Sequence, residues 1–322
     1  MNENVMREVI DMINKRIPLK LTLLIFATIC MVLIQYILVP GSVTLGQFMI
    51  VSRQASALGI IALGQAIVIL VGGIDLSVGS IVMTTNLFCI ASMRGSNDYL
   101  LYGLGLCFLI AVLVGFFNSV GILYLGIAPF VMTLCTMTIL QGICYVYTQG
   151  APTGSAAPMI RSLGTGYFCK IPYSTIIWVV LAFVSIIILK LTTLGRKIYA
   201  VGGNSRAAEL SGINSKAIIT FAYVFSAILS MISGVILSGY LNISSLTVGG
   251  DYVNNSLAAV LIGGNAISGG KGGIIGVVFG AFLMTYLLAI LTMLGIGEVG
   301  KLIVQGIVIF TVVALQGIRQ KS

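Results

Sequence analysis

Histidine is absent from the chain, and charged residues are scarce. Asp, Glu, Lys and Arg make up 8% of the 322 residues, whereas soluble domains carry about 25%. Without histidine, the sequence lacks the commonest general base and the commonest transition-metal ligand. These absences exclude an ordinary soluble enzyme, histidine-based hydrolysis and the usual haem-linked chemistry.

Cysteine occurs six times, but never with a spacing that is typical of a metal site. Five of the six lie inside apolar runs: Cys30, Cys89, Cys107, Cys135 and Cys144. Cys169 alone lies in a segment that we expect to be an outer loop, where it has no partner cysteine. We therefore expect free thiols that behave as small apolar side chains, with no metal site and no cofactor.

Apolar residues are abundant, at 58% of the chain against about 45–50% in soluble domains. Nine runs contain no charged residue: 21–52, 54–74, 76–93, 99–160, 171–189, 217–250, 252–270, 272–297 and 302–318. A helix needs about 20 apolar residues to cross a bilayer, and the run 99–160 is long enough for two crossings. The pattern predicts an all-α polytopic membrane protein with about ten transmembrane helices.

The net charge of +9 reports membrane topology rather than nucleic-acid binding. Basic residues cluster before the first run (Arg7, Lys15, Arg16, Lys20), in one internal loop (Lys190, Arg196, Lys197, Arg206, Lys216) and at the end of the chain (Arg319, Lys321). The positive-inside rule places these three regions in the cytoplasm. With both termini inside, the number of spans is even, which agrees with ten.

The predicted spans follow from these runs. They cover residues 21–39, 55–72, 76–93, 99–125, 129–147, 173–190, 217–239, 253–268, 273–295 and 300–317. The first is interpreted as a retained span, because it is too long for a cleaved signal. Segment 148–172 is rich in Gly and Pro, which predicts an outer loop.

Two stretches of the chain resemble each other, Leu70–Ser80 and Leu261–Lys271. Each follows an apolar run with a double glycine and small polar residues. Internal repeats with discontinuous helices near the translocation path are frequent in transporters, which predicts two related halves of unresolved orientation. The alternative is that membrane helices reuse Gly and Ser for close packing.

Asp75 is the most informative single residue of the first half, because a carboxylate within a membrane run is costly unless it is paired, hydrated or near the interface. As a helix N-cap it would satisfy free backbone N–H groups at the start of the third span. A role in proton or substrate binding is the alternative.

The internal basic loop predicts a short helix over residues 206–211. Asn204 or Ser205 suits its N-cap, and Gly212 suits a left-handed residue after it. Held between two spans in the cytoplasm, such a helix is a docking element for a partner protein. The alternative is a loop that sets topology and binds anionic lipid head groups.

Three motifs, in the same order, resemble those of the permease subunits of ribose, xylose, galactoside and related simple-sugar ABC importers. They are Gly72–Ser80; Gly195–Asn204 with its continuation Ala207–Ile213; and Leu257–Gly264 followed by Ser268–Gly272. The resemblance covers residues 45–318. It identifies the family without naming the sugar.

The resemblance implies four partners: a separate ABC ATPase subunit, a periplasmic or lipid-anchored sugar-binding protein, a second permease chain in a homodimer or heterodimer, and membrane lipid. It also implies transport by alternating access. The implied domains are a cytoplasmic N-terminal segment 1–20, a transmembrane permease domain 21–318 with a cytoplasmic coupling loop 191–216, and a cytoplasmic tail 319–322. The multi-pass chain would reside in the bacterial inner membrane.

Site residues follow from position within these motifs. Coupling to the ATPase is assigned to Arg196, Arg206, Ala207, Ala208, Glu209 and Gly212, and structural or gating roles to Gly72, Gly73, Asp75, Gly263 and Gly264. Buried amides and hydroxyls on apolar helices are candidates for the substrate path: Gln65, Asn86, Asn118, Thr133, Gln141, Asn254, Asn255 and Gln305. For each of these, a packing role between helices is the alternative.

The chain has no nucleotide-binding motif of its own. The Gly-Lys pair Gly270-Lys271 has Asn265 where a P-loop needs glycine and Gly272 where it needs Ser or Thr. We therefore expect no catalysis by this chain. An ion- or proton-coupled secondary transporter is one rival interpretation, and an integral membrane enzyme is another. The run Tyr252–Leu257 is neutral where many family members carry acidic residues, which leaves the solute open.

Overall fold

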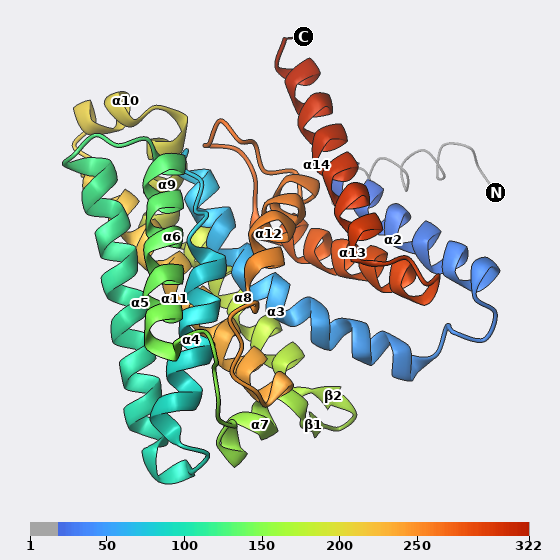
Figure 1. Cartoon of the computed structure of the whole chain (residues 1–322). Coiled ribbons are helices and arrows are strands. Elements are labelled where there is room, and N and C mark those ends of the chain that lie inside the picture. Colours follow the sequence, from blue (N-terminus) through green and yellow to red (C-terminus); the bar gives the residue numbers. More distant parts are fainter. Residues whose placement is uncertain (1–18, 322) are drawn as a thin grey trace, which may run out of the picture.

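The computed structural model describes residues 19–321 (Figure 1). In that range a helix lies in each of the ten predicted spans: α2 (Leu19–Leu38), α3 (Leu45–Leu70), α4 (Val78–Met93), α5 (Leu100–Leu123), α6 (Pro129–Thr148), α8 (Tyr173–Leu191), α11 (Ser215–Leu241), α12 (Gly250–Ile262), α13 (Ile274–Met293) and α14 (Glu298–Lys321). The other elements are η1 (Asn97–Tyr99), α7 (Pro158–Thr165), β1 (Tyr167–Phe168), β2 (Ile171–Pro172), α9 (Thr193–Gly203) and α10 (Ser205–Leu210). The predicted N-terminal segment 1–20 lies almost entirely outside the described residues.

Six helical segments are long and apolar enough to cross a membrane: 45–70, 97–123, 129–148, 173–191, 215–241 and 274–293. The chain is therefore an all-α polytopic membrane protein. Two of the predicted spans are shorter than a full crossing, because α4 has 16 residues and α12 has 13. At 1.5 Å of rise per residue, α12 covers about 20 Å of a hydrocarbon core roughly 30 Å thick. Ten complete crossings remain a prediction.

Four predicted segments differ from the structure in detail. The predicted span 55–72 begins ten residues earlier, at Leu45. The segment 148–172 is a connection rather than a span, as predicted, but it carries the short helix α7 and a small hairpin over residues 167–172. The loop 191–216 contains α9 as well as the expected short helix. The predicted span 253–268 begins three residues earlier and ends at Ile262, where a glycine turn stops the helix.

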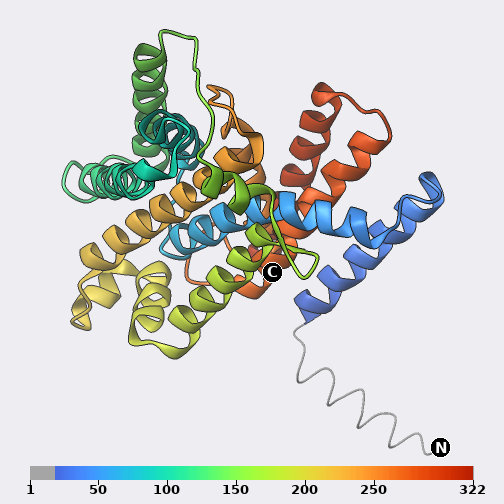
Figure 2. The same cartoon turned by 90° about the horizontal axis from the view of Figure 1, so that it is seen from below.

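Helix α3 runs through the centre of the molecule. Viewed from below, α11 and the α4–α6 group lie on one side of it, and α2, α13 and α14 lie on the other (Figure 2). Nearly all residues of α3 from Val51 to Leu70 are buried. Glycines permit its close packing, since a Cβ on Gly59 would overlap Trp178 of α8 and one on Gly64 would meet Ser226 of α11.

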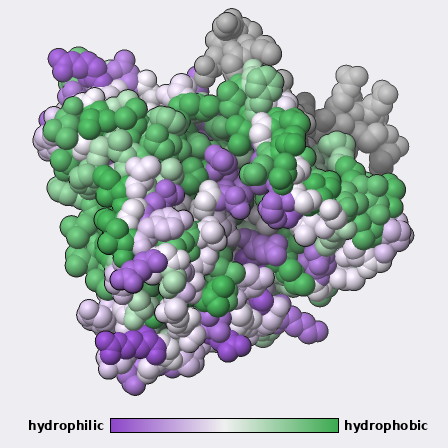
Figure 3. Space-filling model, viewed as in Figure 1, coloured by the Kyte–Doolittle hydropathy of each residue, from purple (hydrophilic) through white to green (hydrophobic). Residues whose placement is uncertain are grey.

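The two ends of the molecule differ from its middle. In the face shown in Figure 3, apolar residues cover α5 and α6 on the left and the α13 region on the right. Hydrophilic residues gather around α10 at the top, around α7 at the bottom, and in a patch between the two apolar areas. We call the two poles the α10 end and the α7 end. A belt of exposed apolar side chains between polar poles is the surface that a bilayer requires.

Candidate functional site

The first motif forms a break between α3 and α4. Helix α3 ends in a Schellman turn, in which Gly73 N–H donates to Val68 O at 2.9 Å. Gly72 takes a φ of +85°, a conformation that favours glycine. Residues 73–76 are then non-helical until α4 begins at Val78. The double glycine therefore ends one helix inside the membrane domain and leaves its polar backbone groups in need of partners.

Asp75 lies within this break and is 1% exposed. Its Oδ1 accepts from the N–H of Ser77 at 3.0 Å and from the Ser77 hydroxyl at 2.6 Å, and its Oδ2 accepts from the Ser226 hydroxyl of α11 at 2.9 Å. The carboxylate thus binds the N–H of the residue just before α4, but the N-cap of α4 is Ser77, which has no side-chain cap bond, so Asp75 is not the N-cap that the sequence predicted. In the described part of the chain, no salt bridge involves Asp75.

The same network extends into α5 and α6. Asn118 Nδ2 donates to the Ser77 hydroxyl at 2.9 Å, and the Thr136 hydroxyl donates to Asn118 Oδ1 at 2.6 Å. Thr133 adds two contacts to the break itself, because its hydroxyl accepts from Leu76 N–H at 3.1 Å and donates to Ile74 O at 3.2 Å. The polar contacts of the break therefore hold four helices, α4, α5, α6 and α11, around Asp75.

The third motif forms a second break, between α12 and α13. Helix α12 also ends in a Schellman turn, with Asn265 N–H donating to Val260 O at 3.3 Å and Gly264 at a φ of +86°. Asn265 Oδ1 accepts from Gly273 N–H at 2.7 Å, immediately before α13. In each break, a side-chain oxygen thus binds a backbone N–H at the start of the next helix.

When the two breaks are compared by their turns, the matching residues differ by one position from those matched by the sequence resemblance of Leu70–Ser80 to Leu261–Lys271. The left-handed glycine is the first of the pair Gly72-Gly73 but the second of the pair Gly263-Gly264. The same type of turn also follows α10 at Gly212 and α13 at Gly295. The shared turn is therefore consistent with related halves but does not demonstrate them.

The basic loop forms a compact pair of helices at the α10 end (Figure 1). Asn204 caps α10, since its Oδ1 accepts from Ala207 N–H at 3.0 Å. Gly212 takes a φ of +79° after the helix. Arg206 and Glu209 are exposed and form a salt bridge, with 3.5 Å between Arg206 Nη1 and Glu209 Oε2. Ala208 between them is buried in the hydrophobic core. The capped helix and its left-handed glycine agree with the sequence prediction.

The candidate path residues differ in burial and in hydrogen bonding. Asn86 and Asn118 are buried and bonded: Asn86 Nδ2 donates to the Ser238 hydroxyl at 3.0 Å and Asn86 Oδ1 accepts from Ser245 N–H at 2.9 Å. Gln65 is fully buried with neither amide atom hydrogen-bonded in the described structure, and Asn255 is 6% exposed with its Oδ1 unpaired. Gln305 is buried, Gln141 is half-buried and Asn254 is exposed.

Two further features escaped the sequence prediction. Ser226, which binds Asp75, lies on a face of α11 where Ser226, Ser230 and Ser233 recur at helical spacing, all fully buried. That spacing is the signal that could have found it. Helix α9 is the second feature, and its role depends on tertiary contacts that sequence periodicity does not report.

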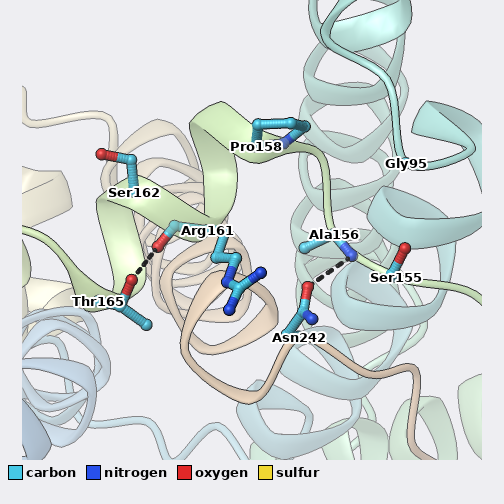
Figure 4. Close-up of a pocket in the computed structure, with 8 residues that line it drawn as sticks. All are labelled: Gly95, Ser155, Ala156, Pro158, Arg161, Ser162, Thr165 and Asn242. Carbon is cyan, nitrogen blue, oxygen red and sulfur yellow. Dashed lines mark hydrogen bonds between the residues drawn. The ribbon is translucent and has the colours of Figure 1, made fainter.

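A pocket of about 360 Å³ opens at the α7 end (Figure 4). It is lined by Gly95, Ser155, Ala156, Pro158, Arg161, Ser162, Thr165 and Asn242. Asn242 Oδ1 accepts from Ala156 N–H at 3.3 Å, which holds the non-helical segment before α7 in place beside the pocket. The guanidinium of Arg161 points into the opening and forms no salt bridge in the described chain. The pocket therefore presents positive charge and hydroxyl groups at the surface of the α7 end.

Comparisons with known proteins agree with the motifs. A family model described as "Branched-chain amino acid transport system / permease component" matches residues 47–313. The ribose import permease protein of Haemophilus influenzae is 36% identical over 291 residues, which cover 89% of this chain and 90% of that protein. The ribose import permease protein of Bacillus subtilis is 38% identical over 281 residues, 84% of each chain.

A galactose/methyl galactoside import permease protein of Haemophilus influenzae is 27% identical over 299 residues, 87% of this chain and 89% of that protein. No solved structure matches the chain significantly.

Proposed function

The chain belongs to this family of transport permease components, and from that premise we propose that it is the membrane-spanning subunit of an ABC importer for a simple sugar. The observation that carries the proposal is the near full-length similarity to ribose import permeases. The family description names amino acids, but the most similar relatives named by solute transport ribose or galactosides. A pentose is therefore the first candidate, with other simple sugars and polyols next.

The motor is a separate ATPase that docks on α10. The exposed Arg206 and Glu209 offer charged contacts, and Gly212 ends the helix sharply beside them. The basic residues of the loop 191–216 place the α10 end in the cytoplasm. Helix α14 also ends on that side in Figure 1, which supports a cytoplasmic tail. Ten crossings and two related halves complete the proposed topology.

Gln65 and Asn255 are the strongest path candidates. Each is a buried amide with an unpaired polar atom on one of two packed helices, α3 and α12. A buried polar atom without a partner costs about 1–3 kcal/mol, so its presence calls for a function. Neutral amides donate to and accept from sugar hydroxyls without binding charge. The other candidates for the substrate path rank below these two; they are Asn86, Asn118, Gln141, Asn254 and Gln305.

The sugar arrives on a binding protein that docks at the α7 end. The pocket around Arg161 suits an acidic side chain of that protein, because its guanidinium has no acidic partner within the described chain. A second permease chain would pair with this one in the membrane, and the exposed Asn254 places polar surface on α12 where such pairing would shield it from lipid.

A secondary transporter remains the alternative. Coupling to protons or ions generally uses buried ionisable pairs, whereas Asp75 is bound by a backbone N–H and two serine hydroxyls. This favours a structural carboxylate over a proton relay.

The proposal is tested by complementation in a bacterium that lacks its own ribose uptake. The chain is expressed with the ATPase and binding protein encoded beside it, and uptake of radiolabelled ribose, xylose, galactose and a branched-chain amino acid is measured. We expect uptake of one sugar that requires all three proteins. Uptake of the amino acid alone would contradict the sugar assignment.

A further inference from the structure

Three segments that are far apart in the sequence, one of them the C-terminal end of α9, meet with their backbones in direct contact. We call this contact the glycine junction; it comprises Leu70–Gly72, Gly202 and Gly269–Gly270. Gly270 N–H donates to Leu70 O at 2.9 Å. A Cβ on Gly202 would overlap the Leu70 carbonyl and the Gly270 N–H, and a Cβ on Gly269 would meet the Gly202 carbonyl and the Gly72 backbone. No side chain separates the three backbones at these contacts.

Each segment of the junction has a different origin. Leu70–Gly72 is the end of α3 at the first break, Gly269–Gly270 belongs to the loop of the second break, and Gly202 lies in the last turn of α9. The two breaks thus contact each other and the same helix. Since backbone contacts have no rotamers to adjust, a shift of α9 displaces both breaks directly.

Side chains of α9 also contact the elements that form the glycine junction. Ile198 and Val201 are buried in the same core cluster as Leu70. The hydroxyl of Tyr199 donates to the carbonyl of Gly272, in the loop of the second break, at 3.0 Å. Burial raises the pKa of Tyr199, so the phenol keeps the proton that this bond uses.

Helices α9 and α10 are joined by one residue. Asn204 N–H donates to Ala200 O at 3.1 Å and closes α9, while Asn204 Oδ1 accepts from Ala207 N–H and opens α10. With no flexible linker between them, the two helices move as one body. On the far side of that body, α10 presents Leu210, 79% exposed, beside Arg206 and Glu209.

We propose that Gly202 is a positioning residue that transmits movement of α10 to both helix breaks through the glycine junction. The inference rests on the proposed docking of an ATPase at α10, and it adds the route by which that docking reaches the membrane domain. A displacement of α9 and α10 as one body would move the end of α3 and the loop before α13 at the same time, so that both breaks change together.

The test compares adjacent glycines in the complete transporter, reconstituted with its ATPase and binding protein. Gly202→Ala adds a methyl group that must push α9 off the junction. Gly203→Ala is the matched control, because a Cβ there meets no atom of the described chain within 4 Å. Tyr199→Phe removes the bond to Gly272 without adding volume. The readouts are ATPase co-purification, thermal unfolding and sugar transported per ATP hydrolysed.

We expect all three variants to bind the ATPase. Gly202→Ala should lower sugar transported per ATP about tenfold, since small misplacements far from a site have large effects, and Tyr199→Phe should lower it by a smaller factor. Gly203→Ala should match the unaltered chain. An unchanged ratio in Gly202→Ala, or an equal loss in Gly203→Ala, would overturn the inference.

If Gly202→Ala does not assemble, Tyr199→Phe decides: a reduced ratio supports the junction and an unchanged ratio refutes it. The unaltered chain is measured first. If it shows no ATP-driven transport, the proposed function is wrong, whereas failure of the variants alone refutes only the route through Gly202.

Discussion

Single buried polar residues in this protein differ in whether they have partners. Asp75, Asn86 and Asn118 are engaged in hydrogen bonds that hold helices together. Gln65 and Asn255 retain unpaired atoms in equally buried positions. Satisfied groups stabilise the fold, while unsatisfied ones cost stability and are the better candidates for contact with solute.

Asp75→Asn tests whether Asp75 acts through its hydrogen bonds to Ser77 and Ser226 or through its negative charge. The asparagine keeps an oxygen for Ser77 N–H, and the Ser226 hydroxyl can turn to accept from its amide, so we expect normal folding and transport within a few-fold of the unaltered chain. Asp75→Leu should instead lower the free energy of unfolding by about 2–4 kcal/mol, because it strands buried donors. Thermal unfolding and uptake are measured for both. Normal folding of Asp75→Asn with complete loss of transport would show that the negative charge, and not the hydrogen bonding, is the main role of Asp75.

Gln65→Leu separates function from packing on α3. Because the amide has no partner in the described structure, its removal should leave the unfolding temperature unchanged or raised. Uptake should fall about tenfold if the amide contributes one hydrogen bond of roughly 1.4 kcal/mol to the passing sugar. Asn86→Leu is the contrast, since it breaks bonds to Ser238 and Ser245 and should destabilise the protein. Unaltered uptake by Gln65→Leu would remove this residue from the path.

At the scale of elements, α10 and the α7-end pocket are the two surfaces that we propose as contacts for other proteins. Each presents charge in a fixed position: α10 through its cap at Asn204, and the pocket through the anchored residues Ala156 and Asn242. Preorganised surfaces of this kind bind with little loss of conformational entropy.

The double substitution Glu209→Ala with Gly212→Ala should weaken ATPase association. It removes an exposed charge and places a side chain at a φ of +79°, at a cost of about 1 kcal/mol for the turn that ends α10. The matched control is Asp98→Ala with Gly150→Ala, which removes an exposed acid and a glycine at a φ of +76° at the other end. Co-purification is the measurement. Equal ATPase recovery from both double variants would refute docking at α10.

Arg161→Glu should weaken docking of the binding protein. Reversing the charge in the pocket should raise the dissociation constant about threefold to tenfold, a typical effect for a partly exposed interfacial charge. Lys170→Glu makes the same charge change at the same end but outside the pocket lining. Surface plasmon resonance with the binding protein compares the two. A loss that is equal in both variants would indicate general electrostatics rather than a specific pocket.

The elements that sequence predicted well are those that the bilayer itself dictates. The predicted spans 99–125, 129–147 and 173–190 locate α5, α6 and α8 to within two residues, because a charge cannot enter the hydrocarbon without great cost. Helix α9 was missed, since its glycines and charges have no membrane signal and its stability comes from packing on Leu70. That Asp75 would bind a backbone N–H near the start of α4 was predictable from local chemistry, but the N-cap itself is Ser77, and the bond from Asp75 to Ser226 joins residues 151 apart in sequence.

At the scale of the whole molecule, the polar contacts form one connected route from the α10 surface to the buried breaks. Helix α9, which Asn204 joins to α10, contributes Gly202 to the glycine junction, and the first break at that junction carries Asp75 and the network that reaches α11, α5 and α6. Within the described chain, nothing in this route supplies energy. The central claim is therefore that transport is driven from outside the chain, by a partner acting on α10.

Sugar uptake into proteoliposomes tests that claim most directly. Vesicles contain this chain with or without its ATPase, with ATP inside or outside, and receive the sugar-loaded binding protein on the opposite face. We expect uptake only when the ATPase is present and ATP is on its side of the membrane. Concentrative uptake by vesicles that contain this chain alone, driven by a proton or ion gradient, would contradict the claim.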